Sequence, residues 1–600
     1  MPGWPRFAKG DFIVVDCETT SLKYWTPEYR LLGFSVATGY GLEPFFIDLR
    51  REPRGLDWLK DQWPNVIIGG WHTKIDLHFL AAADEFFLHN RPHGYYCGMV
   101  AEALLDEHRL QYSLDSVAKD RLGRGKVEVG DKTRLEELPP EKLAEYATGD
   151  ADLTYRIIRQ QLPELREQEL EDVFRLEMDL MPVLFHMEHT GVRVDLEAAE
   201  RSIPILTDKI DTLQREINID VGKPFNVNST PQIRAIFQPE KVSQWQYKLI
   251  DGTLCETTKT GGPCIDQHIL KEMQHPLAGK IRRLRKLIKT RDTFVRGHVL
   301  GHADARGRLH PTINQTKSDN DAGTGSGRMS ITDPALQQIP ARDKDTAAVI
   351  RPLLLPDEDQ EWICTDYSQI DFRMAGHLIK DPQIYKAYEE DPDADFHQIV
   401  SDMTGIPRNP AYAGAPNAKQ LDLGMAFGAG AGKIAKTMGM PYTVSENAGR
   451  MWFIPGPEAE KIFSEYHGRF PRIKKFQEEA TSIARMRGYV KTFTGRRIRF
   501  PNRGTAHKAA GLLYQSYAAD LHKIGLINLD RRLQDTGARL IVPVHDEANV
   551  SGHREQAELV RSAYIDIDAV QEYAPGFQLR VPVRASLGIG PSWYEATKKD

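Results

Sequence analysis

The chain has 600 residues and a formal net charge of −6, with 41% hydrophobic and 27% charged residues. This is the composition of a globular protein of roughly three to five domains. The five scattered cysteines, with no CxxC pair, argue against a disulfide framework and a zinc site, and no stretch approaches the roughly 20 apolar residues of a membrane span. We therefore expect a protein of a reducing, cytoplasmic setting without membrane association.

The predicted elements divide the chain into an α/β beginning, a helical middle and a mixed end. Strands are predicted at Phe12–Val15, Leu32–Val36 and Val66–Gly69. From about residue 163 to 310 long helical patterns dominate, with breaks at 222–231 and 257–263. Strands and helices alternate after Gly307, where residues 318–327 read as a Gly-rich loop.

Acidic residues follow the first predicted strand. Asp16 and Glu18 are two positions apart, so a strand points both to one face. Asp76 follows the third strand, and Tyr146 and Asp150 are four positions apart, which places them on one face of a helix. Such carboxylates can share a metal ion, and a neighbouring tyrosine can orient an attacking water.

Two further carboxylates end β-branched runs far apart in the chain. Asp366 lies in Trp362–Arg373, and Asp546 lies in Leu540–Val550. Strand periodicity places each at the edge of a buried sheet. Two such carboxylates can hold a pair of divalent ions, as in-line phosphoryl transfer requires. The pair therefore predicts a second metal centre.

Between these runs, one segment has a helical pattern with chemistry on one face. In residues 417–428, Lys419, Leu423 and Phe427 recur every fourth residue, which aligns a cation, an aliphatic side chain and a ring. The lysine can neutralise charge on a triphosphate.

Local basic runs offset the acidic average. Lys280–Arg296 carries eight basic residues against one acidic, and Arg485–Arg503 carries seven against none. Each run fits either a surface that follows a phosphate backbone or a solvated basic helix face, and its location beside the other motifs favours the first interpretation.

The amino-acid sequences of these motifs resemble those of a known family. DYSQIDFR (366–373) and VHDE (544–547) resemble motifs A and C of family A DNA polymerases, the bacterial DNA polymerase I type, and residues 417–428 resemble motif B. The order and spacing of the four acidic residues and the tyrosine in the N-terminal region resemble the DEDDy 3′–5′ proofreading exonucleases that precede the polymerase in this family. These residues are Asp16, Glu18, Asp76, Tyr146 and Asp150. The resemblance covers about residues 10–594 and implies an RNase H-like α/β domain followed by a right-hand polymerase, with an antiparallel palm sheet and helical thumb and fingers.

The resemblance also implies domain limits and site roles. The expected domains are an exonuclease (1–165), a thumb (166–310), a first palm part (311–380), fingers (381–485) and a second palm part (486–600). The implied metal ligands are Asp366, Asp546 and the Tyr367 carbonyl in the palm, and Asp16, Glu18, Asp76 and Asp150 in the exonuclease, where Tyr146 positions water. The expected metal is Mg²⁺, two ions per site, which Mn²⁺ could replace. The implied nucleotide contacts are Asp371, His397, Lys419, Leu423 and Phe427. The implied DNA contacts are Arg328, Gln337, His545, Arg496, Arg497 and Gln515.

At six positions the residue differs from the one that is usual in the family. In the exonuclease His72 replaces Asn, and in the polymerase Asp371 replaces Glu, Ala415 replaces Arg, Leu423 replaces an aromatic, Phe427 replaces Tyr and Gly511 replaces Asn. The shorter carboxylate at Asp371 bears on exclusion of the ribose 2′-hydroxyl, and the loss of the phenol at Phe427 removes a hydrogen bond.

We expect a template-directed DNA polymerase with proofreading, working as a monomer on primer–template DNA and dNTPs. The layout is Klenow-fragment-like and suggests a phage enzyme acting in the cytoplasm of its host. One alternative is a polymerase specialised for a modified nucleotide such as 2-aminoadenine. Two less favoured alternatives are a single-subunit RNA polymerase and an inactive DNA-binding scaffold.

Overall fold

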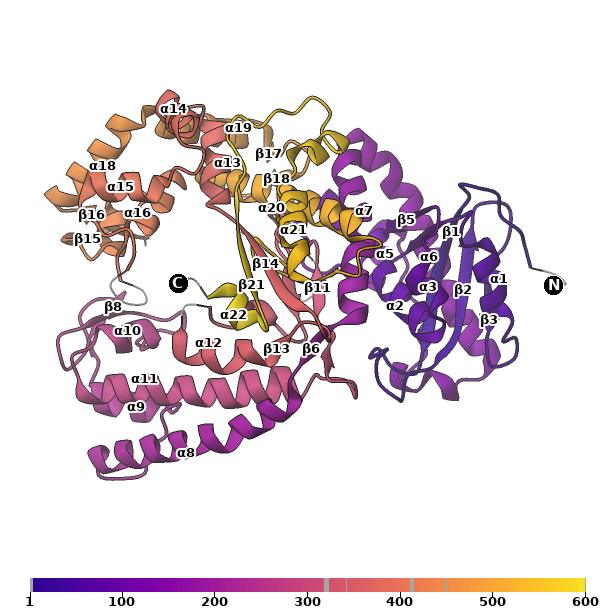
Figure 1. Cartoon of the computed structure of the whole chain (residues 1–600), viewed down its shortest axis with the longest axis horizontal. Helices are drawn as coiled ribbons and strands as arrows, with labels where there is room; N and C mark the ends of the chain where they lie inside the picture. Colours follow the sequence, from indigo (N-terminus) through magenta and orange to yellow (C-terminus); the bar gives the residue numbers. More distant parts are fainter. Residues whose placement is uncertain (1–3, 318–322, 342, 411–414, 448–449, 599–600) are drawn as a thin grey trace.

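A computed structural model describes residues 4–317, 323–341, 343–410, 415–447 and 450–598. Figure 1 shows an N-terminal α/β domain on the right and a larger hand-like body on the left, in which a central sheet lies between an upper and a lower helical lobe. Among the described residues, none of the helices combines the length and the apolar character needed to cross a bilayer.

The N-terminal domain is a five-stranded mixed sheet in the order β3-β2-β1-β4-β5, covered by helices. β1 pairs antiparallel with β2 and parallel with β4. Its apolar residues Ile13–Val15 are fully buried, so the carboxylates that follow them emerge at the rim of a rigid sheet. The strands are β1 (Phe12–Thr19), β2 (Leu31–Thr38), β3 (Phe45–Asp48), β4 (Ile67–Gly70) and β5 (Gly94–Cys97), and the helices are α1 (Gly55–Gln62), α2 (Thr73–Ala83), α3 (Phe86–His89), α4 (Gly98–Leu105), α5 (Leu114–Leu122) and α6 (Pro140–Glu167).

Helix α7 (Glu171–Thr190) connects this domain to the body. Val173 and Phe185 pack into the N-terminal core, whereas Leu176 and Leu180 pack into the core of the central sheet. The sequence assigned this helix to the thumb. The structure instead places it between two domains, because two of its faces are apolar.

The lower lobe in Figure 1 contains the region predicted to be the thumb, and this name is kept for it. Its long helix α8 (Leu196–Val221) begins at Asp195, which accepts a hydrogen bond from the Ala198 amide, and ends at Gly222, whose φ of 75° is left-handed. A small three-stranded sheet at the tip was not predicted from the sequence. The other elements are α9 (Thr230–Phe237), β7 (Glu240–Lys241), β8 (Gln246–Lys248), β9 (Leu254–Glu256), α10 (Gln267–Glu272), α11 (Pro276–Ile288) and the helical segment η2 (Lys289–Leu300).

The central sheet, which lies in the region predicted to be the palm and keeps that name, is antiparallel in the order β19-β20-β14-β21. Its largest buried side chains include Trp362 and Trp593, which stack with ring centroids 5.9 Å apart. The sheet strands are β14 (Glu361–Tyr367), β19 (Arg539–Val544), β20 (Glu547–Gly552) and β21 (Ala585–Gly590), and the helices are α12 (Lys344–Ile350), α20 (Ala509–Leu533), α21 (Ala557–Tyr564) and α22 (Trp593–Thr597). Short strands complete the palm: β6 (Val192–Val194), β10 (Arg308–Leu309), β11 (Thr312–Asn314), β12 (Ser330–Thr332), β13 (Leu354–Leu355), β17 (Tyr489–Lys491) and β18 (Arg497–Arg499).

The upper lobe in Figure 1, which contains the region predicted to be the fingers and keeps that name, is a helical bundle with its own apolar core and one β-hairpin. The sequence predicted its helices but not the hairpin. The elements are α13 (Ile370–Ile379), α14 (Pro382–Glu390), α15 (Phe396–Thr404), α16 (Ala418–Ala426), α17 (Ala431–Thr437), β15 (Tyr442–Asn447), β16 (Arg450–Pro455), α18 (Pro457–Arg469) and α19 (Pro471–Arg487).

Candidate active sites

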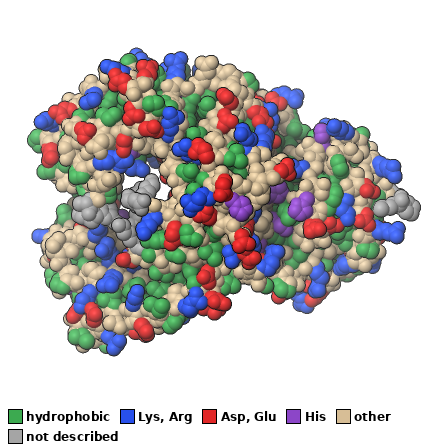
Figure 2. All heavy atoms as spheres, in the orientation of Figure 1, with side chains coloured by type: hydrophobic (Ala, Val, Ile, Leu, Met, Phe, Trp, Pro, Cys, Tyr) green, Lys and Arg blue, Asp and Glu red, His purple; other side chains and the backbone are tan. Residues whose placement is uncertain are grey.

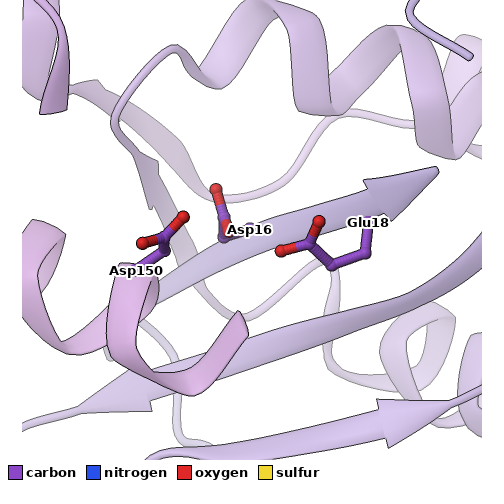
Figure 3. Close-up of side chains that lie close together, drawn as sticks. All are labelled: Asp16, Glu18 and Asp150. Carbon is purple, nitrogen blue, oxygen red and sulfur yellow. The ribbon is translucent and has the colours of Figure 1, made fainter. Parts of the chain in front are cut away.

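The first acidic centre lies on the rim of the N-terminal sheet. Asp16 and Glu18 come from β1 and Asp150 from α6, and one carboxylate oxygen of each lies within 4.8 Å of the others. Figure 3 shows the three side chains converging on one point. Asp76, on α2, accepts a hydrogen bond of 3.0 Å from the Cys17 amide, which ties it to the same strand.

The electrostatics of this centre fit a hard cation. Burial raises the pKa of Asp16 to about 7, and the negative charge of Asp150 adds to the shift. Burial also raises the pKa of Glu18 and Asp76, with a further contribution from Asp16. Closely spaced buried carboxylates repel one another as anions, and a divalent cation with oxygen ligands relieves that repulsion.

The sequence analysis missed a lysine at this centre. Lys126 forms an ion pair with Asp150, and its ammonium lies 5.1 Å from the ring centroid of Tyr146. Its backbone amide donates to Asp115 at 2.9 Å, which fixes the loop that carries it. Burial raises the pKa of Tyr146, so its phenol remains a hydrogen-bond donor at neutral pH. Lys126 lies in a Gly-rich segment without periodicity, so no sequence pattern indicated it.

The second acidic centre lies on the palm sheet. Asp366 is near the end of β14, where it pairs in register with Glu547 of β20, and Asp546 occupies the turn between β19 and β20. The Tyr367 amide donates to the Asp546 carbonyl at 3.3 Å. Strand pairing therefore brings the two predicted aspartates side by side.

An arginine lies among these carboxylates. The Arg328 guanidinium donates to Asp371 at 2.7 Å and lies 3.8 Å from Asp546. Burial raises the pKa of Asp546 to about 6, and Arg328 opposes this shift. Arg328 was predicted to touch DNA and Asp371 to approach the ribose. In this structure Arg328 and Asp371 form an ion pair with each other. Either side chain would contact substrate while it is part of this pair or after the pair has separated.

Two tyrosines hold the backbone beneath the palm aspartates. The Tyr367 hydroxyl donates to the Tyr564 carbonyl at 2.8 Å, and the two rings stack 4.2 Å apart. The Tyr564 hydroxyl in turn donates to the Asp546 carbonyl at 2.9 Å. Tyr564 was not identified from the sequence, because its partners come from two other elements.

The predicted nucleotide residues of the fingers divide into two groups. Lys419, Leu423 and Phe427 are all half-buried along α16 and just beyond it. His397 differs, since it is only 1% exposed and its Nδ1 lies 2.7 Å from Asp422, which also accepts a hydrogen bond from Tyr466. The prediction that His397 reaches the nucleotide phosphates does not match this conformation, because a buried carboxylate holds the imidazole inside the fingers.

The residues predicted to contact DNA also differ in how exposed they are. Arg496 is 3% exposed and its guanidinium pairs with Asp520 at 2.7 Å and Glu177 at 2.6 Å, so the structure corrects its role to an internal ion pair. His545 is exposed, and Gln337, Gln515 and Arg497 are half-buried.

The basic runs are partly neutralised within the protein. In 485–503, Arg499 donates to Gln168 at 2.7 Å and Lys491 pairs with Glu169 at 2.9 Å. This run therefore joins the palm to the end of the N-terminal domain, which revises its predicted role as a phosphate track. In 280–296, Lys280 and Lys286 also have carboxylate partners.

Gly511 and Phe427, two of the positions that differ from the usual family residue, are in contact with each other. A β-carbon at Gly511 would lie 2.7 Å from the Phe427 ring, so the ring packs directly on the α20 backbone. Any side chain at residue 511 would displace Phe427. Ala415 is buried, and the nearby Arg408 pairs with Asp395 at 2.8 Å.

An acidic centre on a mixed sheet, followed by an acidic pair on an antiparallel palm between thumb and fingers, defines a DNA polymerase with an attached 3′–5′ exonuclease. Residues 197–595 match the family model described as DNA polymerase family A, and residues 6–166 match the model described as 3′–5′ exonuclease. The chain belongs to DNA polymerase family A and is a DNA-directed DNA polymerase with a 3′–5′ exonuclease domain.

Relatives support the same assignment. The chain is 38% identical to DNA polymerase DpoZ of Salmonella phage PMBT28, across 100% of this chain and 99% of the relative, and 36% identical to DpoZ of Acinetobacter phage SH-Ab 15497, with the same coverage. It is 30% identical to the thermostable DNA polymerase I of Thermus aquaticus, across 70% of this chain and 48% of that protein. The fold resembles the POL domain of Pol1 from M. smegmatis in complex with DNA primer–template and dNTP, with a TM-score of 0.78 and 23% identity over 98% of this chain and 97% of that one.

These comparisons confirm the predicted family, fold class and enzyme class. They also confirm that its relatives include phage enzymes. They do not support specialisation for a modified nucleotide.

Proposed function

We propose that the palm centre extends a primer 3′-hydroxyl with dNTPs and that the N-terminal centre removes nucleotides from the same end. The observation that carries this proposal is the adjacency of Asp366 and Asp546 on one palm surface, between the thumb and the fingers. The resemblance in fold to a polymerase complexed with primer–template and dNTP supports placing the DNA between the two lobes.

Polymerase and exonuclease domains of these families use divalent metals. Here Asp366, Asp546 and the Tyr367 carbonyl would hold two Mg²⁺ ions, and Asp16, Glu18, Asp76 and Asp150 would hold two more, with Mn²⁺ as a substitute. When bound, such ions activate the attacking oxygen and stabilise the leaving oxygen of an in-line displacement.

The remaining roles belong to the protein's own side chains. Lys419 would bind the triphosphate, while Leu423 and Phe427 would line the nascent base pair. Gln337 and Gln515 would donate to minor-groove acceptors, which are nearly alike for all correct pairs and so report pair geometry.

In the exonuclease centre, Tyr146 would orient the attacking water. Its ring lies against the ammonium of Lys126, which also pairs with Asp150, so α6 and the loop that carries Lys126 together fix the phenol near the carboxylates. We further infer that the enzyme acts as a monomer in the cytoplasm of an infected host, in keeping with its phage relatives.

A gel assay tests both activities. A 5′-labelled primer annealed to a longer template is incubated with Mg²⁺, with and without dNTPs, using wild type, Asp546→Ala, Asp16→Ala and the control Glu555→Ala at an exposed palm position. We expect Asp546→Ala to lose only extension, Asp16→Ala to lose only shortening, and the control to retain both. A wild-type protein that shortens the primer but never extends it would overturn the polymerase proposal.

A further inference from the structure

The thumb and the fingers touch at their tips. Lys436, on α17 of the fingers, forms an ion pair with Glu256 at the end of β9 in the thumb. Figure 1 shows the thumb-tip sheet directly below the β15–β16 hairpin, on the side of the molecule away from the N-terminal domain. The two lobes are thus joined both through the palm and through this second contact.

An apolar seam accompanies the ion pair. A space of about 400 Å³ lies between the tips, and Leu254 and Val444, which are 48% and 40% exposed, belong to its walls. The lining residues are Gln246 and Leu254 from the thumb and Gly439, Met440, Pro441, Tyr442 and Val444 from the fingers. This space is open to solvent and its apolar side chains stay partly exposed, so the contact lacks the close packing of a protein core and can separate without disrupting either lobe.

Each tip is a rigid unit of its own. In the fingers, a β-carbon on Gly432 would lie 1.7 Å from the Phe453 carbonyl, so α17 packs closely against the hairpin, and Lys436 lies 4.5 Å over the Phe453 ring. In the thumb, Cys255 is buried between strands and the Tyr247 hydroxyl donates to the Gly261 carbonyl at 2.8 Å. The contact therefore joins two preformed surfaces.

We propose that the two tips form a bridge that closes a ring around primer–template DNA. This inference rests on the proposed function, which places the DNA between thumb and fingers. Figure 2 shows an opening between the two lobes, above the thumb and below the fingers. With the bridge closed, DNA without a free end leaves only after the tips part. Because an exposed ion pair and a loose apolar seam hold the tips, the bridge opens readily for loading.

A charge-swap series tests the bridge. Lys436→Glu and Glu256→Lys each place like charges opposite one another, and the double variant restores an opposite pair. Lys433→Glu, an exposed position on the same helix, is the control for net charge. Product length is measured on a primed single-stranded circle, with excess unlabelled DNA trapping enzyme that dissociates.

We expect each single variant to shorten the products by at least about 3-fold, since like charges weaken the contact, and the double variant to recover them. The control should match wild type. The rate of adding one nucleotide should be unchanged in all four variants. Products of wild-type length in both single variants would overturn the bridge, whereas failure of wild type to add a single nucleotide would instead overturn the proposed function.

Cross-linking distinguishes enclosure from tighter binding. Glu256→Cys and Lys436→Cys are combined and joined with a bis-maleimide, and wild type treated in the same way controls for its own cysteines. Joining the tips after loading should retain the enzyme on circular DNA through a high-salt wash but release it from linear DNA. Joining them before loading should prevent extension on circles. Equal extension in both orders would show that DNA does not pass through the ring.

Discussion

The two acidic centres of this polymerase are assembled differently. In the exonuclease, Asp16, Glu18 and Asp150 converge within one domain and a lysine of that domain neutralises part of their charge. In the palm, Arg328 pairs with Asp371 and lies 3.8 Å from Asp546, and Lys419, the proposed triphosphate ligand, comes from the fingers. The exonuclease centre is thus complete in one rigid body, whereas the polymerase centre depends on how two lobes are placed.

The largest expected effect separates the centres. Asp16→Ala should reduce exonuclease activity, and Asp366→Ala should reduce extension, each by about 10³-fold or more, because a metal contribution of several kcal/mol is lost. Single-turnover rates on matched substrates measure both. If one substitution reduced both activities, the centres would not be independent.

The next largest effect is expected for Lys126, the cation beside the exonuclease carboxylates. Lys126→Met should slow the exonuclease by about 10- to 100-fold, as for other groups that orient metal ligands, while extension remains unchanged. Lys126→Arg should recover part of the loss. Lys142→Met, at an exposed position of α6, is the control. An unchanged exonuclease rate in Lys126→Met would contradict the positioning role.

The pH dependence of metal binding should differ between the centres. The pKa of Asp16 is about 7 and that of Asp546 about 6, so each carboxyl is protonated below its pKa and releases a proton when metal binds. Lowering the pH should weaken metal binding below about 7 in the exonuclease and only below about 6 in the palm, by about 10-fold per pH unit for each proton released.

Calorimetry with Mn²⁺ can separate these titrations. The exonuclease centre is measured in Asp366→Ala and the palm centre in Asp16→Ala, each in two buffers of different ionisation enthalpy to count released protons. If Mn²⁺ binding weakened at the same pH in both variants, the predicted difference in pH dependence between the two centres would be wrong.

The smallest effect concerns the contact between Gly511 and Phe427. Gly511→Ala places a methyl group against the ring and should raise the KM for dNTPs by about 2- to 10-fold, since overpacking of this size costs about 1 kcal/mol. The double variant with Phe427→Leu should recover part of the loss, and exonuclease activity should not change. Steady-state kinetics of single-nucleotide addition measures it.

Much of the architecture was readable because local signals agree with it. The predicted strand at Phe12–Val15 is the start of β1, and the predicted break after residue 221 is the left-handed Gly222 at the end of α8. The short strands β3 and β5, the thumb-tip sheet and the β15–β16 hairpin were missed. The strands of two to four residues have too few positions to show a period, and their pairing depends on tertiary contacts. The six-residue strands β15 and β16 were missed although they are as long as the palm strands β19, β20 and β21.

The sequence by itself determined the family, the order of the exonuclease and polymerase domains and the candidate metal-ligand carboxylates, because motif residues and strand or helix periodicity are local properties. Only the tertiary structure decided which cations face those carboxylates. Lys126 reaches Asp150, Arg328 pairs with Asp371, and buried carboxylates hold the side chains of Arg496 and His397 inside the protein. Charges interact strongly only at a few ångströms in a low-dielectric environment, and those distances are set by folding.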